Sequence, residues 1–101
     1  MPKGYLIAHV KVNDFEAFTP YKERAWELVD KYHGKWIVRA PLGGDVRENA
    51  NGIASGSATV VVEFESLELA KAYYESEDYQ AAMKLRLNNS ESTFVLVEGA
   101  E

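Results

Sequence analysis

The sequence lacks cysteine, an excess of basic residues and any long apolar run, and each absence excludes a class of protein. Without cysteine the chain has no disulfide, no thiolate nucleophile and no cysteine ligand for zinc. Its net charge of −5 disfavours a nucleic-acid partner, because phosphate binding needs a basic face. No stretch reaches the ~20 apolar residues of a membrane span, and the first residues lack the apolar region of a signal peptide. A cytoplasmic protein is therefore expected.

Motifs for phosphate binding, nucleophilic catalysis and metal binding are missing as well. The Gly43-Gly44 pair has neither the flanking lysine nor the following helix of a phosphate-binding loop, and no nucleophile elbow occurs. The two histidines, His9 and His33, fall on different predicted elements without a nearby acidic cluster, which makes a poor metal site. We expect no metal and no cofactor, and we expect His33 to cap the end of a helix.

What remains is typical of a small globular protein. The 101 residues are 47% hydrophobic and 27% charged, which predicts a single domain over residues 1–101 with a core of its own. Four segments have the periodicity or the short apolar runs of β-strands. Because alternate residues of a strand point to opposite faces, each has an apolar face that packs under helices. These predicted strands span residues 4–12, 35–40, 58–64 and 92–99.

Three segments repeat apolar residues at helical spacing. In the first, Asn13 or Asp14 caps a short turn, and the main helix then begins at Pro20 with Thr19 as its N-cap, where proline is tolerated. Gly34 is expected to adopt the left-handed conformation that ends this helix. The other two helices are predicted over residues 67–75 and 77–86, with Ser66 and Ser76 as their N-caps.

Residues 41–57 are too long for a plain hairpin loop in so compact a protein. One alternative is an extended hairpin, in which Gly43-Gly44 forms a bulge, a strand resumes at residues 45–48, and Asn51-Gly52 makes the turn. The other alternative is a mobile surface loop, and the sequence leaves both open.

The order of the elements, β-α-β-β-α-β, predicts a ferredoxin-like α+β fold. In this fold the four strands form one antiparallel sheet in the order 4-1-3-2, with the helices on one face. The first and third strands then lie in the middle of the sheet.

Three stretches of the sequence resemble a known family. They are KYHGKWIVRA (residues 31–40), VVVEFESLELAKAYYESEDYQAAMKLR (residues 60–86) and FVLVEG (residues 94–99). Together they are similar to the bacterial family called domain of unknown function 1330, over nearly the whole chain. The resemblance implies the dimeric α+β-barrel superfamily, in which two ferredoxin-like units pack their open sheet faces together. The family has no agreed activity, so the resemblance implies none.

The sheet face away from the helices combines ionisable and apolar side chains. In the order 4-1-3-2, Glu63 neighbours Tyr5 and Lys35, whereas His9 and Arg39 fall in another row. In a functional interpretation, His9 is a general base or hydrogen-bond donor and Arg39 holds an anionic group of a substrate. In a structural interpretation, Glu63 forms an ion pair with Lys35 or Arg39, and His9 bonds within an interface. We favour the structural interpretation and a Glu63–Lys35 pair.

A second group of polar side chains comes from the predicted helices. Tyr73, Tyr74 and Tyr79, followed by Arg86, either line a cavity between helix and sheet or belong to the core with their hydroxyls at its rim. The candidate ligand pocket therefore comprises His9, Arg39, Tyr79 and Arg86.

The apolar residues of the open face predict a homodimer. Ile7, Ile37 and Val61 would be exposed in a lone subunit, and a contiguous apolar patch marks an interaction site. A row of the last strand adds to this patch, and depending on register it is Val95 with Val97 or Phe94 with Leu96. The alternative is a monomer in which residues 45–57 fold back and cover the same patch.

Three functions fit these features. The first is a dimer that binds a small organic molecule without established catalysis. The second is a cofactor-free enzyme of the isomerase, dehalogenase or monooxygenase type, an idea that rests on analogy of fold. The third is a structural or stress-related protein without a ligand.

Overall fold

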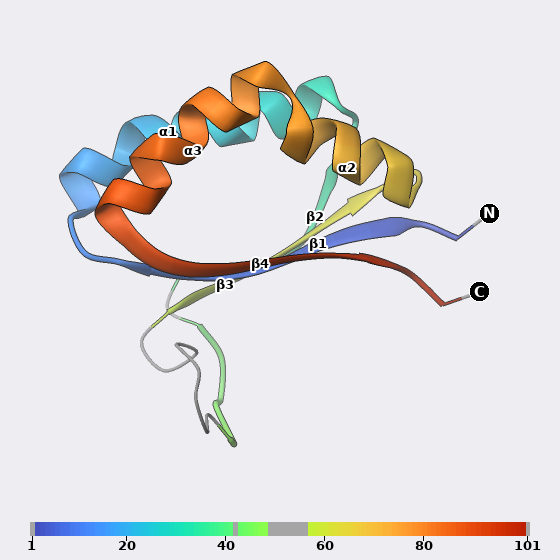
Figure 1. The fold of residues 1–101 in the computed structure, drawn as a ribbon. Coiled ribbons are helices and arrows are strands. Elements are labelled where there is room, and N and C mark those ends of the chain that lie inside the picture. The colour runs from blue at the N-terminus through green and yellow to red at the C-terminus, as the bar shows by residue number, and fades with distance from the viewer. Residues whose placement is uncertain (1, 42, 49–56, 101) are drawn as a thin grey trace.

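The computed structural model describes residues 2–41, 43–48 and 57–100. All of its helices lie on one face of a single sheet (Figure 1), and α2 and α3 together occupy the place of the second helix of a β-α-β-β-α-β fold. The elements are β1 (Gly4–Val12), α1 (Phe15–Lys31), β2 (Lys35–Ala40), β3 (Ala58–Phe64), α2 (Leu67–Glu75), α3 (Glu77–Asn89) and β4 (Ser90–Glu98).

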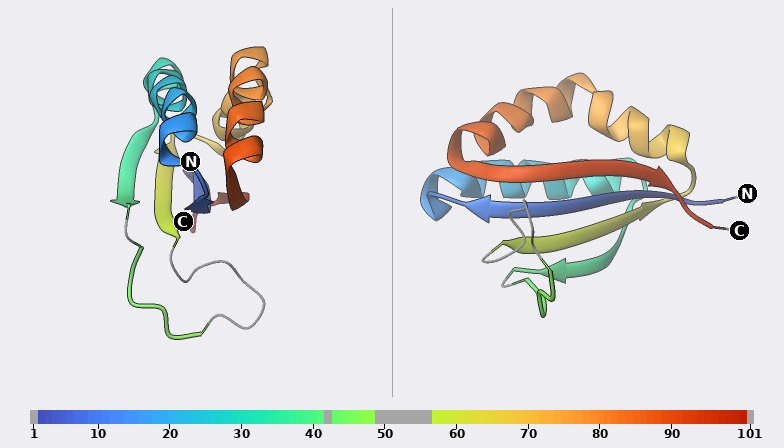
Figure 2. Two further views of the ribbon diagram at one scale, coloured as in Figure 1. Left: turned by 90° about the vertical axis from the view of Figure 1, so that its left-hand side faces the viewer. Right: turned by 60° about the horizontal axis from the view of Figure 1, so that its bottom comes forward.

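The strands are antiparallel and lie in the order β2-β3-β1-β4, which confirms the predicted ferredoxin-like fold. Figure 2 shows β1 and β3 between the two edge strands. The register selects one of the two alternatives for β4: Val95 pairs with Ile7 and Val97 with Tyr5, so Val95 and Val97 lie on the open face. The last strand also begins two residues earlier than predicted, at Ser90.

The core fills the layer between helices and sheet. Leu6 and Ala8 of β1 and Val62 and Phe64 of β3 are at most 3% exposed, and they pack against the apolar stripes of the helices. Burial of these side chains is the main stabilising contribution to such a fold. The helical part of the core consists of Phe18, Tyr21, Ala25, Leu28, Val29, Ala70, Tyr73, Tyr79 and Ala82.

Helix α1 begins earlier than the sequence predicts. Asp14 is its N-cap and accepts a hydrogen bond from the Ala17 amide at 3.1 Å, so the helix continues through Pro20. The prediction that Thr19 caps a helix beginning at Pro20 is wrong. Pro20 is exposed, so the carbonyl that loses its intrahelical partner there can be hydrated, which lowers the cost of proline inside a helix. Ser66 and Ser76 cap α2 and α3 as predicted, and α3 ends three residues later, at Asn89.

The residue in the left-handed conformation at the end of α1 is His33, with φ of 60°, and not Gly34. The Gly34 amide donates to the Val29 carbonyl and the His33 amide to that of Asp30, which is the Schellman pattern. Gly34 is required for a different reason, because a Cβ there would lie 2.8 Å from a methyl group of Val29 and 3.0 Å from Phe64. The backbone of His33 thus caps the helix.

Strand β2 contains a bulge that the sequence did not predict. Trp36 pairs with Val62, but Val38 pairs with Val61 and Arg39 with Val60, so Ile37 is an extra residue. A bulge reverses the face on which the following residues lie relative to simple alternation. Val38 is therefore on the open face. Arg39 is on the helix-facing side, whereas regular alternation predicted it on the open face.

The hairpin prediction for residues 41–57 is partly testable. Residues 43–48 form no strand, so a strand resuming at residues 45–48 is excluded, and this segment extends away from the sheet (Figure 1). Gly43 has φ of 74°, and its amide donates to the Ala40 carbonyl at 3.0 Å, which turns the chain directly after β2. The predicted turn at Asn51-Gly52 lies outside the described residues.

Candidate functional site

A cavity of about 230 Å³ lies between α1 and the helix-facing side of the sheet. Its walls are mainly aliphatic and aromatic, as in binding sites for small organic molecules. An adjoining hollow of about 450 Å³ shares Lys22, Pro41 and Ala58 with it and extends to Phe15 at the start of α1. The cavity is lined by Leu6, Ala8, Val10, Val12, Phe18, Tyr21, Lys22, Ala25, Trp26, Val29, Trp36, Arg39, Pro41, Ala58, Val60, Val62, Tyr73 and Phe94.

Two cations lie on one side of this cavity, around Trp26. The Arg39 guanidinium stacks 4.6 Å from the ring centre of Trp26 and 5.4 Å from that of Trp36, and the Lys22 ammonium lies 5.4 Å from Trp26. Neither cation has an ion-pair partner within the described part of the chain. The bulge in β2 places Arg39 here, because an unbulged strand would turn its side chain to the open face. An unpaired guanidinium held by two indole rings is suited to binding a carboxylate or a similar anion.

Tyrosines form part of the inner wall. Tyr21 and Tyr73 line the cavity, and the Tyr21 hydroxyl lies 2.8 Å from the hydroxyl of Tyr79, which is completely buried behind them. Burial is the main reason that the pKa of each of these three tyrosines is raised. At neutral pH their hydroxyls are therefore protonated and can donate hydrogen bonds.

Arg86 is a buried cation directly behind this wall, only 3% exposed. Its guanidinium lies 3.9 Å from the ring centre of Phe94 and 6.0 Å from that of Tyr21, and its Nη1 donates to Ser92 Oγ. Its Nε is buried without a hydrogen-bond partner. No carboxylate of the described residues forms an ion pair with it, although an unpaired buried charge costs several kcal/mol.

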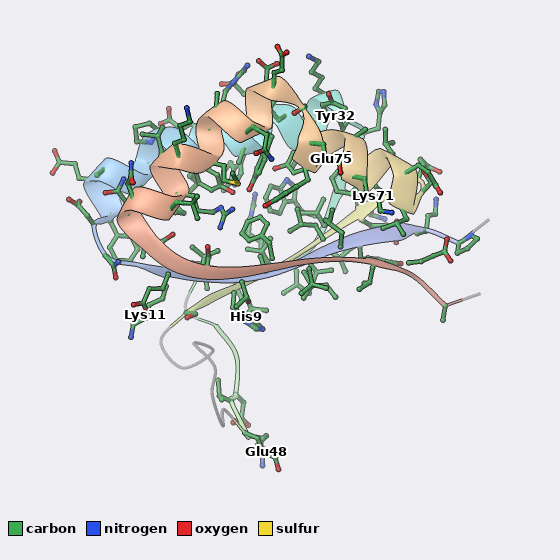
Figure 3. All side chains as sticks on the ribbon, in the orientation of Figure 1. His9, Lys11, Tyr32, Glu48, Lys71 and Glu75 are labelled. Carbon is green, nitrogen blue, oxygen red and sulfur yellow. The ribbon has the colours of Figure 1, made fainter. Side chains whose placement is uncertain are left out.

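The structure brings only some of the predicted site residues together. Arg39 lies on the cavity lining. Tyr79 and Arg86 lie behind it, because Tyr79 contacts the lining residue Tyr21 and Arg86 contacts the lining residues Tyr21 and Phe94. His9 lies on the other face of the sheet, where Figure 3 shows it pointing away from the helices, and its Nδ1 is 3.3 Å from Thr59 Oγ1. The prediction that His9 and Arg39 share one face is wrong, because the bulge in β2 moves Arg39 to the helix-facing side. A role of these four residues in ligand binding stays a prediction.

Glu63 has the predicted neighbours but not the predicted ion pair. It stands opposite Tyr5 on one side and Lys35 on the other. Its Oε2 accepts a hydrogen bond from the Tyr5 hydroxyl at 2.9 Å, and this bond is the main reason that the pKa of Tyr5 is raised. In the part of the chain that the structure describes, Lys35 and Glu63 form no salt bridge. The partner of the Glu63 carboxylate is therefore the Tyr5 hydroxyl and not the predicted Lys35 ammonium.

Three residues of the cavity were not among the predicted site residues: Tyr21, Lys22 and Trp26. Trp26 could have indicated the cavity from the sequence, because a tryptophan beside the apolar stripe of an amphipathic helix usually packs against a side chain from another element. Trp36 is also on the helix-facing side, opposite Val62. The side chain that packs on Trp26 is Arg39. Regular alternation along β2 had predicted Arg39 on the opposite face of the sheet.

Among residues 2–41, 43–48 and 57–100, no group of three or more histidine or acidic side chains is arranged to hold a metal ion. None of the helices in these ranges is long and apolar enough to cross a membrane.

The antiparallel sheet with its helices on one face and an apolar cavity beneath α1 defines a ferredoxin-like α+β protein. The chain belongs to the family described as domain of unknown function DUF1330, which matches residues 3–100. The resemblance seen in the sequence is thereby confirmed. No curated protein matches the chain.

Solved structures share the fold at low sequence identity. A protein of unknown function from Rhodopseudomonas palustris has a TM-score of 0.71 at 12% identity, covering 99% of this chain and 84% of its own. SnoaB, a cofactor-independent oxygenase from Streptomyces nogalater, has a TM-score of 0.67 at 10% identity, covering 100% and 96%. A dimeric protein of unknown function and ferredoxin-like fold from Bacteroides fragilis has a TM-score of 0.60 at 19% identity, covering 95% of each chain.

Proposed function

We propose that this protein binds a small organic molecule, aromatic or otherwise apolar with an anionic group, in the cavity between α1 and the sheet. The observation that carries the proposal is the lining itself. Its walls are apolar, and its only charged groups among the described residues are the cations of Lys22 and Arg39. A ligand of this class places its apolar body against the aliphatic wall and its anion beside Trp26.

The volume limits the size of the ligand. An engineered cavity of about 150 Å³ in another protein holds benzene, so about 230 Å³ accommodates a single substituted ring. The adjoining hollow between Phe15 and Pro41 leaves room for a substituent that extends past Lys22 toward solvent.

The alternative function is a cofactor-free enzyme of the isomerase, dehalogenase or monooxygenase type, acting on a small and anionic substrate. Its support is the fold shared with SnoaB, which is analogy alone. Within the described residues, the cavity lining contains no histidine and no carboxylate. Burial raises the pKa of Tyr21 and Tyr73, which makes them poor general bases at neutral pH. Binding without catalysis is therefore the function we favour.

A homodimer joined through the open sheet face is part of the proposal. Ile37, Val38 and Val95 are 46%, 38% and 49% exposed on that face, and Ile7 and Val61 lie between them. Pairing two copies about a two-fold axis buries the same patch twice, in an interface expected to exceed ~1,000 Å². The Bacteroides fragilis neighbour is described as dimeric. A single domain over residues 1–101 and a cytoplasmic location stay predictions from the sequence.

Intrinsic fluorescence provides the test, because both tryptophans of the chain, Trp26 and Trp36, line the cavity. We expect quenching by 4-nitrobenzoate and by its neutral analogue 4-nitrotoluene, with tighter binding of the anion. Arg39→Gln should weaken the preference for the anion, and the double variant Lys22→Gln/Arg39→Gln should remove it. Arg24→Gln, which makes the same charge change outside the lining, should do neither.

Three results would contradict the proposal. They are the absence of quenching by both compounds, equal quenching in a variant whose cavity is filled by Ala25→Leu, and an anion preference that survives removal of both cations, Lys22 and Arg39. Native mass spectrometry of the protein purified from its host would then identify a retained ligand, whose predicted class is a small apolar anion.

A further inference from the structure

The hollow beside the cavity is a second apolar space, which a ligand consisting of a single ring would not use. At about 450 Å³ it is larger than the cavity of about 230 Å³. The two spaces are continuous, because they have part of their lining in common: Val10, Val12, Phe18, Lys22, Pro41 and Ala58. A molecule that occupies both therefore has a second apolar part outside the cavity.

Phe15 forms the outer wall of this hollow. It is the first residue of α1 and, at 75%, the most exposed large hydrophobic side chain of the described residues. Phe15, Phe18 and Lys22 recur at helical spacing, so one face of α1 carries two rings and a cation along the two spaces. Contact with a bound apolar group would remove the exposed ring from water, which favours binding.

The polar groups of the hollow limit where an anion can lie. Lys22 lines both spaces, whereas Arg39 lines the cavity alone. Lys11 also borders the hollow, but its side chain points away from the helices (Figure 3). The Thr19 hydroxyl donates to the Phe15 carbonyl at 2.8 Å and is thereby engaged within α1. The outer part of the hollow is therefore suited to an apolar group, and the place for an anion is where the two spaces meet.

We propose that the ligand carries its anionic group between two apolar parts, and that Phe15 selects the outer part. The inner part, a ring, occupies the cavity, and the anion lies beside Lys22 and Arg39. The outer part, an apolar substituent of a few carbon atoms, packs between Phe15 and Pro41. This inference rests on the proposed function, and it narrows the ligand class from apolar anions in general to those with an apolar group on each side of the charge.

Two isomeric probes test the position of the anion. In 2-(4-nitrophenyl)hexanoate the carboxylate lies between the ring and a butyl chain, and in 6-(4-nitrophenyl)hexanoate it lies at the end of the chain. The reference, 4-nitrophenylacetate, has the ring and the carboxylate but no outer part. Binding is measured by quenching of Trp26 and Trp36. We expect the branched isomer to bind about tenfold more tightly than the reference, because it buries the butyl chain, and more tightly than the linear isomer.

Variants of exposed residues test the role of Phe15. Phe15→Ala should reduce the affinity for the branched isomer to about that for 4-nitrophenylacetate, because the outer wall is lost. The exposure of Phe15 makes it unnecessary for the core, so the variant should fold. Leu87→Ala is the matched control, since it truncates a side chain of α3 that is 55% exposed and lines neither space. It should leave the tighter binding of the branched isomer intact.

The possible failures are distinguishable. If 4-nitrophenylacetate binds but the branched isomer binds no more tightly, the inference is wrong and the binding cavity stands. Equal affinity for the two isomers would overturn it as well, because the anion would not need an apolar group on each side. So would a Phe15→Ala variant that keeps the full gain or that weakens the branched isomer and the reference equally. If none of the three compounds quenches the fluorescence, the proposed function itself is refuted.

Discussion

Arg39 is the cross-strand partner of Val60 and therefore lies on the same side of the sheet as the buried core. Simple alternation from Lys35 would put it on the open face. One extra residue, Ile37, reverses the face on which Arg39 lies. The position of this cation in the proposed binding site therefore depends on the bulge.

We predict that deletion of Ile37 is tolerated. Without the extra residue, Trp36, Val38 and Arg39 alternate regularly and keep their present partners, so Arg39 stays against Trp26. The melting temperature should change by a few degrees at most, and the response of tryptophan fluorescence to 4-nitrobenzoate should be retained. The control is deletion of Val61 from the unbulged central strand β3, which reverses the faces of one half of that strand and should unfold the protein. Loss of folding on deletion of Ile37 would show that the bulge itself is required.

We predict that Val61→Arg separates the dimer. Val61 lies at the centre of the open face, opposite Ile7 and Val38, and two copies of a buried arginine would face each other across a two-fold axis. Light scattering at micromolar concentration should give the mass of two chains for the wild type and of one chain for the variant. Val46→Arg adds the same charge to an exposed position outside the sheet and should leave the dimer intact. A wild type with the mass of one chain refutes the dimer.

We predict that Glu63 is structural. Glu63→Gln keeps a hydrogen-bond acceptor for the Tyr5 hydroxyl but removes the charge, so stability should fall only slightly, by a few degrees of melting temperature at most. The pKa of Tyr5 should move down toward its ordinary value, because the bond to the carboxylate is what raises it, and this shift is measurable by tyrosinate absorbance. Binding of 4-nitrobenzoate should not change. A large loss of binding with unchanged stability would make the carboxylate functional.

We predict that the protein loses stability in alkali. The pKa values of Tyr21, Tyr73 and Tyr79 are raised above 10.0 in the folded protein. In the unfolded chain they ionise near that value, so above it the folded state binds more protons and the free energy of unfolding decreases as pH rises. Tyr79→Phe should reduce the slope by up to about 1.4 kcal/mol per pH unit, measured by urea unfolding between about pH 9 and pH 11. Full ionisation of all six tyrosines at pH values where the protein is still folded would contradict the prediction.

The fold could be predicted from the sequence because its signals are local and agree with one another. The alternation after Leu6, the caps at Ser66 and Ser76, and the β-α-β-β-α-β order all favour one topology. The end of α1 was located correctly for the wrong reason. Gly34 is required not by its own backbone conformation but by contacts with Val29 and with Val62 and Phe64, the last two about thirty residues away.

The site was harder to predict because it depends on one irregularity and on buried contacts between distant residues. No property of the residues around Ile37 distinguishes a bulged strand from a regular one. The proximity of Tyr21 to Tyr79 and of Arg86 to Phe94 follows from how α1 and α3 pack on the sheet. Tyr79 and Arg86 could be named as pocket residues from their types. Tyr21, which lines the cavity and contacts both of them, could not.

The bulge in β2 also bears on aggregation. β2 is an edge strand, and an edge with a regular row of free N–H and C=O groups is a template on which strands of other molecules can add. The extra residue between Trp36 and Val38 interrupts that row, and the charges of Lys35 and Arg39 flank it. Deletion of Ile37 would leave a regular edge strand of five residues, because β2 has six. We therefore expect the shortened chain to fold, but to form insoluble strand-paired assemblies more readily on prolonged storage. Keeping molecules apart would then be a second reason for the irregular strand.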